Sequence, residues 1–450
     1  MKLSKDLAKD LAEINKLTIK DKKMLFMLII DFYAASFAGV KQNQIFNYAV
    51  EKILLEQNGN EDASVFMQEK KYPVQVAAFL NAIYAHGAEL DDGNKKAMGH
   101  VGTHVIPAVF ALAEKIKSTC EDVLVALAVG YEAYIRISAS AQPGMVQRGF
   151  HSTGMAGTLA CAAACAKLYH LNSKGIENAI ALATTMSGGL LSYGDSRPAI
   201  KPLNPAKAAE NGVFAATLAQ KGIEGPIEAL EGKNGWLHAV TESFDETFLK
   251  GADDGHLLLH DCYFKLYPSC RHTHCGIEAA IHLHSKVNLD LIKEINVYIY
   301  PNAIKLAGQI KFPRNQDETK FSIHYTLACA LANGRYSIDD MNPNNLTEEI
   351  VSLINKINLI ADETMENRKQ GVRGTKVEII SLDGRKEQDV ILVPRGDPEN
   401  PLTREDIINK LKVCAVGQVN EKTLDDLVET IEKMDGDKRF KYPLEGVQTV

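Results

Sequence analysis

The spacing of apolar residues changes near residue 260, and this change constrains the fold of the 450-residue chain more than any other feature. Before it, the dominant period is helical. Four N-terminal residues at intervals of four, four and three lie on one face of an amphipathic helix: Leu3, Leu7, Leu11 and Ile14. Similar patterns fill three further stretches: 74–88, 107–117 and 120–139. The stretch 155–168 is rich in Ala, Gly and Cys on all faces, which predicts a buried, closely packed helix.

After Tyr263 the pattern favours an α+β arrangement. Three segments are predicted to be strands: 295–300, 376–382 and 389–393. Asp383-Gly384 joins the last two in a predicted hairpin, because Asp-Gly supplies the positive φ angles of a tight turn. Two segments between the strands are helical in pattern: 322–332 and 348–360.

Thr403 and Asp406 form a predicted N-cap box that opens two closing helices, which are expected to dock on the N-terminal part. The fold class is therefore mainly α, with two domains. A large all-helical domain consists of residues 1–262 together with 403–450, and a smaller α+β domain consists of residues 263–402.

The net charge and the cysteine content limit the partners and the cellular compartment that we expect for this chain. With 57 acidic and 50 basic side chains the net charge is -7, so we expect no nucleic acid and no anionic membrane as partner. No stretch is expected to reach the roughly 18 to 20 apolar residues of a membrane span, and no signal peptide is predicted. Eight cysteines are too dilute for a disulfide framework, which favours a reducing, cytoplasmic location.

Two neighbouring segments gather carboxylates and imidazoles. His86-Gly-Ala-Glu-Leu-Asp-Asp-Gly93 carries three carboxylates, and crowded carboxylates raise some pKa values, which suits proton transfer. The alternative is a solvated helix end. His100 and His104 share a helix face and raise the possibility of a metal site with Asp91 or Asp92, but the glutamate of the zincin motif is missing, so we predict no metal.

Two further segments are suited to anion binding. Arg148-Gly-Phe-His-Ser-Thr-Gly154 precedes the small-residue helix, so Ser152 or Thr153 is expected to cap it while Arg148 and the free amides face a carboxylate; the alternative is an ordinary capped helix. In Arg197-Pro-Ala-Ile-Lys-Pro-Leu203 the prolines limit backbone motion and aim Lys201, although most lysines only solubilise.

Tyr267-Pro-Ser-Cys-Arg-His-Thr-His-Cys275 lies where the two halves of the chain meet, and domain junctions are preferred places for ligand clefts. Arg271, His272 and His274 make the segment cationic and provide imidazole as an acid or base. Its two cysteines lack a second pair at zinc-ribbon spacing and are interpreted as structural.

The chain resembles the MmgE/PrpD family over nearly its whole length. The similarity is strongest in Arg148-Gly-Phe-His-Ser-Thr-Gly, in Lys201-Pro-Leu with the Ala-Ala-x-Asn-Gly that follows, and in Tyr267-Pro-Ser-Cys-Arg-His-Thr-His. The resemblance implies that the α+β domain is a lid, that the protein is commonly a homodimer, and that its chemistry uses no metal or nucleotide cofactor.

The resemblance also assigns site residues. The family's lysine falls on Lys201, two histidines fall on His274 and His100, and a tyrosine falls on Tyr325. The sequence departs from the family pattern at several positions: Glu89 where aspartate is usual, Gly93 where threonine is usual, Val-Gly after His100, and Ser196-Arg197-Pro198 before the lysine.

We hypothesise that Lys201 and Arg271 hold substrate carboxylates, that His274 and His100 exchange protons, that Asp92 orients an imidazole, and that Tyr325 donates to an oxygen. Further substrate-binding candidates are Glu89, Asp91, Arg148, His151, Arg197 and His272. The implied activity is a lyase, with dehydration of a small hydroxy di- or tricarboxylate expected first. Alternatives are a cis-aconitate-type decarboxylase, an iminodisuccinate-type epimerase, and a catalytically silent helical dimer that binds a carboxylate.

Overall fold

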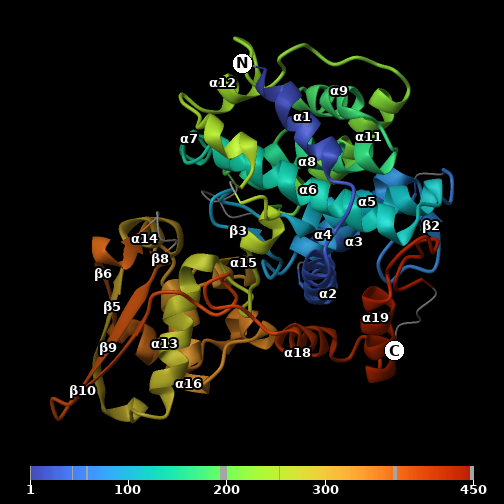
Figure 1. The fold of residues 1–450 in the computed structure, drawn as a ribbon. Helices are drawn as coiled ribbons and strands as arrows, with labels where there is room; N and C mark the ends of the chain where they lie inside the picture. The colour runs from blue at the N-terminus through green and yellow to red at the C-terminus, as the bar shows by residue number, and fades with distance from the viewer. Residues whose placement is uncertain are drawn as a thin grey trace. The chain divides into compact units, whose positions relative to one another are not determined.

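The computed structural model describes residues 2–42, 44–56, 59–192, 200–252, 254–367 and 372–445. The chain divides into two compact units. Unit 1 consists of Met1–Gly87, Asp91–Tyr263 and Thr403–Val450, and unit 2 of Ala88–Leu90 and Phe264–Leu402. Figure 1 shows the helices that dominate the chain, so the mainly α prediction is confirmed.

Unit 1 is built from helices with two short strand pairs. Its helices are α1 (Leu3–Glu13), α2 (Ile19–Lys41), α3 (Gln44–Leu55), α4 (Val74–His86), α5 (Gly102–Ile116), α6 (Cys120–Ser140), α7 (Gly144–Gln147), α8 (Ser152–Leu168), α9 (Ser173–Thr184), α11 (Leu203–Gln220), α12 (Trp236–Val240), α18 (Arg404–Ala415) and α19 (Glu421–Glu432). Its strands are β1 (Ala63–Ser64), β2 (Lys71–Tyr72), β3 (Gly93–Asn94) and β4 (Cys262–Tyr263).

Helix α8 lies among α5, α6, α9 and α11. Every residue of α8 except Lys167 is buried, as the small-residue composition predicted. Glycines permit the close approach: a Cβ at Gly212 of α11 would lie 2.2 Å from the Cβ of Cys161 in α8. The predicted N-cap box of α18 is also present, with Thr403 accepting from the Asp406 backbone N–H.

Two expectations about unit 1 are corrected. It is not all-helical, because β1 pairs with β2 and β3 pairs with β4, both antiparallel. By length and composition, α2 and α6 are also long and apolar enough to cross a membrane, which the sequence expectation had excluded. The apolar window of α2 is 72% buried and that of α6 is 100% buried inside the protein, as core helices are.

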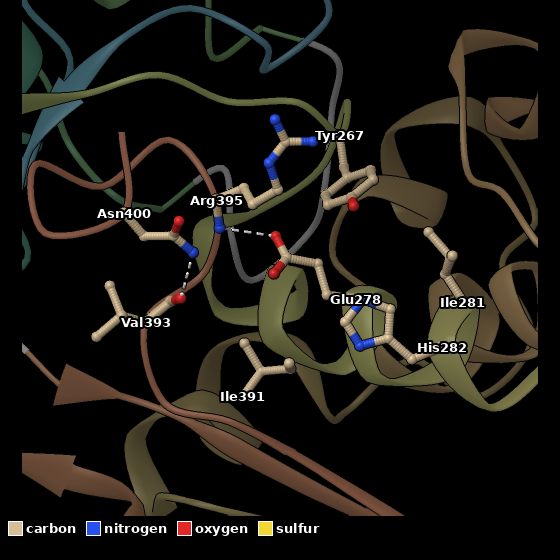
Figure 2. A pocket seen from close by; sticks show the side chains of 8 residues that line it. All are labelled: Tyr267, Glu278, Ile281, His282, Ile391, Val393, Arg395 and Asn400. Atoms are coloured by element: carbon tan, nitrogen blue, oxygen red, sulfur yellow. Dashed lines mark hydrogen bonds between the residues drawn. The ribbon is translucent and has the colours of Figure 1, made fainter. Parts of the chain in front are cut away.

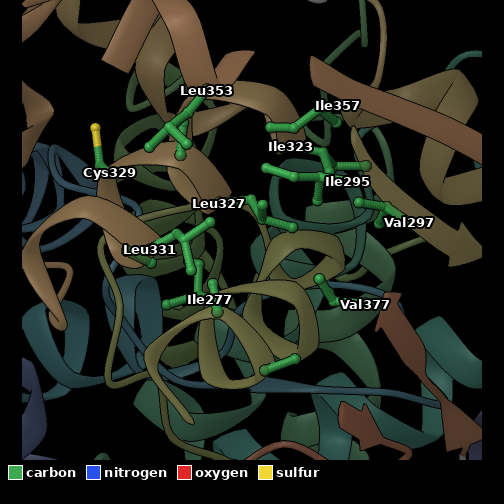
Figure 3. Close-up of a cluster of buried hydrophobic side chains, with 14 of the residues drawn as sticks. Ile277, Ile295, Val297, Ile323, Leu327, Cys329, Leu331, Leu353, Ile357 and Val377 are labelled. Carbon is green, nitrogen blue, oxygen red and sulfur yellow. The ribbon is translucent and has the colours of Figure 1, made fainter. Parts of the chain in front are cut away.

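Unit 2 contains a four-stranded sheet with strand order β10-β9-β5-β6. Its strands are β5 (Ile292–Ile299), β6 (Ile357–Ala361), β7 (Glu366–Asn367), β8 (Val372–Arg373), β9 (Thr375–Ser381) and β10 (Lys386–Ile391). Its helices are α13 (His274–His284), α14 (Pro301–Ala307), α15 (Gln316–Lys320), α16 (Ile323–Asn333) and α17 (Glu348–Lys356). Figure 3 shows part of the apolar core of unit 2, which includes Ile277, Val297, Leu327 and Val377.

Two predictions in unit 2 are corrected. The predicted helix 348–360 ends at Lys356, and the following residues form β6, which pairs in parallel with β5. The hairpin between β9 and β10 turns over three residues rather than two. Gly384 donates to the Ser381 carbonyl and adopts φ +84°, so only the glycine supplies a positive φ.

Candidate functional site

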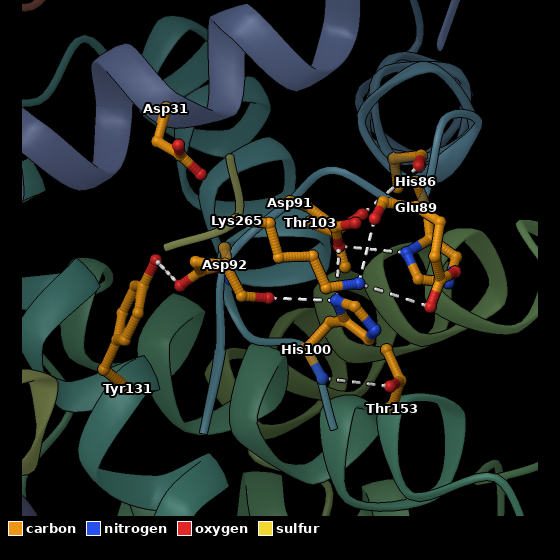
Figure 4. A network of polar contacts seen from close by, with 12 residues as sticks. Asp31, His86, Glu89, Asp91, Asp92, His100, Thr103, Tyr131, Thr153 and Lys265 are labelled. Carbon is orange, nitrogen blue, oxygen red and sulfur yellow. Dashed lines mark hydrogen bonds and ion pairs between the residues drawn. The ribbon is translucent and has the colours of Figure 1, made fainter. Parts of the chain in front are cut away.

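Asp91 holds two histidines in unit 1. Its Oδ2 lies 2.9 Å from Nδ1 of His86 and 3.1 Å from Nδ1 of His100. His86 ends α4 and His100 precedes α5, so the loop between these helices turns the carboxylate toward both rings (Figure 4). All three residues are buried.

The hydrogen bonds define which nitrogen of His100 carries a proton. Nδ1 faces the Asp91 carboxylate and, at 2.9 Å, the Asp92 backbone carbonyl, and both partners only accept. Nδ1 must therefore be the donor. In the neutral ring the lone pair lies on Nε2, which is the arrangement of a general base held by a carboxylate.

The charges of the cluster support this assignment. Burial alone would raise the pKa of Asp91, but the imidazoles of His100 and His86 outweigh it and hold that pKa well below the usual range, so the carboxylate is ionised. Burial lowers the pKa of His86 to about 4, and the positive charge of Lys201 contributes to the lowering. His86 is therefore neutral near pH 7.

Asp92 was expected to orient an imidazole, and the structure corrects the atom involved. Its backbone carbonyl contacts His100, whereas its carboxyl group accepts from the Gly102 N–H at 2.8 Å and from the Tyr131 hydroxyl at 2.9 Å. Burial, together with the charges of Asp31 and Asp91, raises the pKa of Asp92 to about 7. This carboxyl group therefore exchanges a proton near neutral pH.

Asp31 is held by a residue from the far end of the chain. Lys410 of α18 donates to its Oδ1 at 2.5 Å, and both side chains are buried. The pair fastens α18 to α2 and keeps a negative charge close enough to raise the pKa of Asp92.

His151, at the N-cap of α8, adds a third imidazole beside His86 and His100. Its ring centroid lies 6.3 Å from that of His86. The Asn204 amide donates to its Nδ1 at 2.9 Å, so the neutral ring carries its proton on Nε2, opposite to His100. Neither Ser152 nor Thr153 caps α8 as predicted: Ser152 donates to the Met98 carbonyl, and Thr153 accepts from the backbone N–H of His100.

The other predicted residues of unit 1 lie at different depths. Lys201, just before α11, is half-buried and acts electrostatically on His86. Arg148 is exposed at the C-cap of α7. Arg197 lies outside the described residues.

His104, considered above as a partner of His100 in a metal site, lies in the core. Among the described residues neither of its ring nitrogens has a hydrogen-bond partner, and burial lowers its pKa to about 3. Its ring fills the space above Gly157 of α8, where a Cβ would lie 2.8 Å from Nε2. This placement gives His104 a packing function.

In unit 2, Arg271 lies between two buried partners. One guanidinium nitrogen donates to Asp397, and another donates to Nδ1 of His274 at 2.9 Å. Because arginine cannot accept, His274 carries its proton on Nε2, which lies 3.3 Å from the Ser269 carbonyl. The predicted Arg271 and His274 are thus in direct contact.

His272 and Tyr325 are placed elsewhere in unit 2. His272 bonds to the Tyr300 hydroxyl through Nδ1, and burial lowers its pKa to about 3, so the ring is neutral. The hydroxyl of Tyr325 lies 2.7 Å from the Asp340 carbonyl and 2.9 Å from the Asn342 carbonyl. These contacts are structural, and donation by Tyr325 to a substrate stays a prediction.

Glu89 pairs with a buried lysine. Lys265 donates to the Glu89 carbonyl at 2.9 Å and lies 3.4 Å from its carboxylate. Glu89 has φ +55°, a conformation that costs about 1 kcal/mol or more outside glycine and that these contacts compensate.

Sequence reasoning missed several partners that set the properties of the predicted residues. They are His86, Tyr131, Asn204, Lys265, Asp397 and the pair Asp31–Lys410. Lys265 lies two residues before the Tyr-Pro-Ser-Cys-Arg motif and Asn204 three residues after Lys201, so proximity to a motif offered a signal for these two. His86 belongs to the cluster noted in the sequence, but it was not assigned a function there. Tyr131, Asp397 and the pair Asp31–Lys410 lie far along the chain from the residues whose properties they set.

A buried carboxylate that fixes the tautomer of an imidazole, with a lysine whose charge acts on the neighbouring ring, is typical of enzymes that use acid–base chemistry on anionic substrates. Residues 8–249 match the MmgE/PrpD N-terminal domain and residues 267–434 match the MmgE/PrpD C-terminal domain. The chain therefore belongs to the MmgE/PrpD family, which confirms the resemblance seen in its motifs.

Several curated relatives share one activity in their names. A cis-aconitate decarboxylase-like protein of Aspergillus oryzae is 29% identical over 388 residues, covering 80% of this chain and 80% of the relative. The cis-aconitate decarboxylase of Homo sapiens is 26% identical over 429 residues, covering 91% and 86%. The cis-aconitate decarboxylase of Aspergillus terreus is 26% identical over 437 residues, covering 90% and 88%.

Proposed function

We propose that the protein is a lyase that acts on a small di- or tricarboxylate, with decarboxylation of a cis-aconitate-like acid as its first reaction to test. The names of the relatives favour decarboxylation over the dehydration expected from the sequence. The observation that carries the proposal is the contact of His100 Nδ1 with the Asp91 carboxylate and the Asp92 carbonyl.

In this mechanism His100 delivers a proton to carbon. The bond between the substrate carbon and its carboxylate breaks, carbon dioxide leaves, and the electron pair stays on the carbon as a carbanion. The protonated His100 ring, stabilised by ionised Asp91, transfers the proton of Nε2 to that carbon. The ring is then neutral, with its lone pair on Nε2 and its Nδ1–H still bonded to Asp91.

Cations are required while the carbanion exists, because negative charge spreads onto a neighbouring carboxylate. We assign this function to Lys201, whose charge already acts on His86. Arg271, in unit 2, stays a sequence prediction for binding a substrate carboxylate. Asp397 compensates the charge of Arg271, so the guanidinium is held in place before any substrate binds.

Dehydration is the second candidate, supported by the opposite tautomers of two histidines. The neutral His100 ring offers a lone pair to remove a proton next to a carboxylate, whereas the Nε2–H of His151 can donate a hydrogen bond to the departing hydroxyl, which leaves as water with the proton that His100 removed. The same pair would serve an epimerase only if the abstracted proton returned to the other face of the carbon.

Proton NMR in heavy water distinguishes these reactions when the protein is incubated with aconitate-like, citrate-like and aspartate-like acids as substrates. Decarboxylation releases carbon dioxide, dehydration produces a new alkene, and epimerisation exchanges a proton for deuterium without another change of mass. We expect His100→Gln to lower turnover about 10²- to 10⁴-fold, while His238→Gln, at an exposed histidine of α12, serves as the matched control.

Full turnover by a folded His100→Gln variant would contradict the mechanism. Saturable binding of these acids without any turnover would favour the silent carboxylate-binding protein instead. A homodimer, a cytoplasmic location and a lid function of the α+β domain remain predictions that need their own measurements.

A further inference from the structure

A cavity of about 410 Å³ lies within unit 2, between α13 and the segment that follows β10 (Figure 2). This volume suits a small organic ligand. Its lining residues are Tyr267, Glu278, Ile281, His282, Ile391, Val393, Arg395 and Asn400. Glu278, Ile281 and His282 share one face of α13, because they are three and four residues apart.

Glu278 is a buried carboxylate with too few partners. Glu278 is only 5% exposed, and its Oε1 accepts a hydrogen bond from the Arg395 backbone N–H at 2.9 Å. No other hydrogen bond to this carboxylate occurs among the described residues. Burial raises the pKa of Glu278, and a charged donor in the cavity would restore the missing solvation.

Two further acceptors line the same cavity. The Asn400 amide donates to the Val393 carbonyl at 3.2 Å, which leaves its side-chain oxygen as an acceptor. The Tyr267 hydroxyl has no hydrogen bond to another described residue, and Figure 2 shows the Glu278 carboxylate between this ring and the amide. An ammonium group has three hydrogens to donate, one for each of these acceptors.

The other residues that line the cavity provide a positive charge and an apolar surface rather than hydrogen-bond acceptors. Arg395 contributes a guanidinium that suits a carboxylate, and Ile281, Ile391 and Val393 form an apolar wall. One negative and one positive side chain beside an aliphatic surface match a zwitterion better than a simple cation or anion, because each charge of the ligand then meets its opposite.

We propose that this cavity binds a small α-amino acid with an aliphatic side chain. Its ammonium group contacts Glu278, its carboxylate contacts Arg395, and its side chain packs on Ile281, Ile391 and Val393. The cavity adjoins the Arg271–His274 segment, because the Tyr267 ring lies 5.2 Å from the His274 ring. None of the residues that would contact the amino acid is assigned to the proposed reaction, so the proposal does not depend on that function.

Isothermal titration calorimetry of the full chain tests the proposal with three probes. L-leucine carries both charges, isoamylamine lacks the carboxylate, and 4-methylpentanoate lacks the ammonium group. We expect L-leucine to bind more tightly than either. Arg395→Gln should weaken L-leucine and 4-methylpentanoate but leave isoamylamine unchanged, which would assign the carboxylate subsite.

Glu278→Gln should weaken L-leucine about tenfold or more, because a charge-assisted hydrogen bond is lost while the contact with the Arg395 N–H is kept. Glu387→Gln, at an exposed glutamate of β10, is the matched control. If Glu278→Gln does not fold, Ile281→Trp should block L-leucine by filling the cavity. The proposal is wrong if L-leucine does not saturate the wild type, binds no more tightly than isoamylamine, or binds Glu278→Gln or Ile281→Trp as it binds the wild type.

Discussion

Replacing Asp92 with asparagine should remove a pH dependence of stability. In the folded protein burial and the charges of Asp31 and Asp91 raise the pKa of Asp92 from 3.8 to about 7, so between these values the folded chain holds a proton that the unfolded chain releases. The stability from this group is fully present below about pH 4 and is lost as the pH rises through about 7. Asparagine stays neutral and can still bond to Gly102 and Tyr131.

The size of the effect follows from the same pKa. A change from 3.8 to about 7 corresponds to about 4 kcal/mol at pH values above both. Local relaxation reduces this upper bound, so between pH 4 and pH 8 we expect the variant to gain about 2–4 kcal/mol relative to the wild type. At pH 4 the two proteins should differ little.

Urea unfolding followed by tryptophan fluorescence measures this difference. The chain has one tryptophan, Trp236, which is buried in unit 1, so its emission reports on the unit that contains Asp92. Asp426→Asn, at an exposed aspartate of α19, is the matched control. A stability difference between Asp92→Asn and wild type that stays constant from pH 4 to pH 8 would refute the reasoning.

Three further substitutions test other contacts. Lys410→Met should destabilise unit 1 by about 3–5 kcal/mol in the same tryptophan assay, because the buried Asp31 carboxylate loses the charge of Lys410. Adding Asp31→Asn should recover part of the loss, and no recovery would contradict the ion-pair account. Gly93→Ala should cost about 1–3 kcal/mol because its Cβ would lie 2.5 Å from the Tyr263 hydroxyl, and the cost should shrink in a Tyr263→Leu background. Tyr325→Phe should cost about 1–3 kcal/mol of local stability, seen by hydrogen exchange in α16, since the buried Asp340 carbonyl loses its donor. A loss of turnover about tenfold or more in the folded variant would instead support the donor role predicted from sequence.

The clash at Gly93 also explains a departure from the family pattern. The family usually has threonine at this position, and the glycine here accommodates the Tyr263 ring across the β3–β4 pair. In the sequence, Gly93 is recorded only as a departure from the family pattern. The structure accounts for the glycine by a packing partner 170 positions away.

Local patterns were sufficient for some elements but not for others. The buried helix α8 followed from its small residues, and the start of α18 followed from a threonine and an aspartate three residues apart, since these interactions are complete within one turn. Strand β6 was missed because its residues continue the apolar spacing of α17. They become a strand through hydrogen bonds to β5, which lies about 60 residues earlier.

The amino-acid sequence by itself determined the helical periods, the N-cap of α18, the family and the histidine and carboxylate residues of the candidate site, because each of these is expressed in neighbouring residues. Only the tertiary structure decided which carboxylate holds His100. Asp91 and Asp92 are adjacent and chemically identical, yet one is ionised against two imidazoles and the other has a pKa of about 7. Burial and charges brought from distant segments, such as Asp31 with Lys410, cause that difference, and no local pattern contains them.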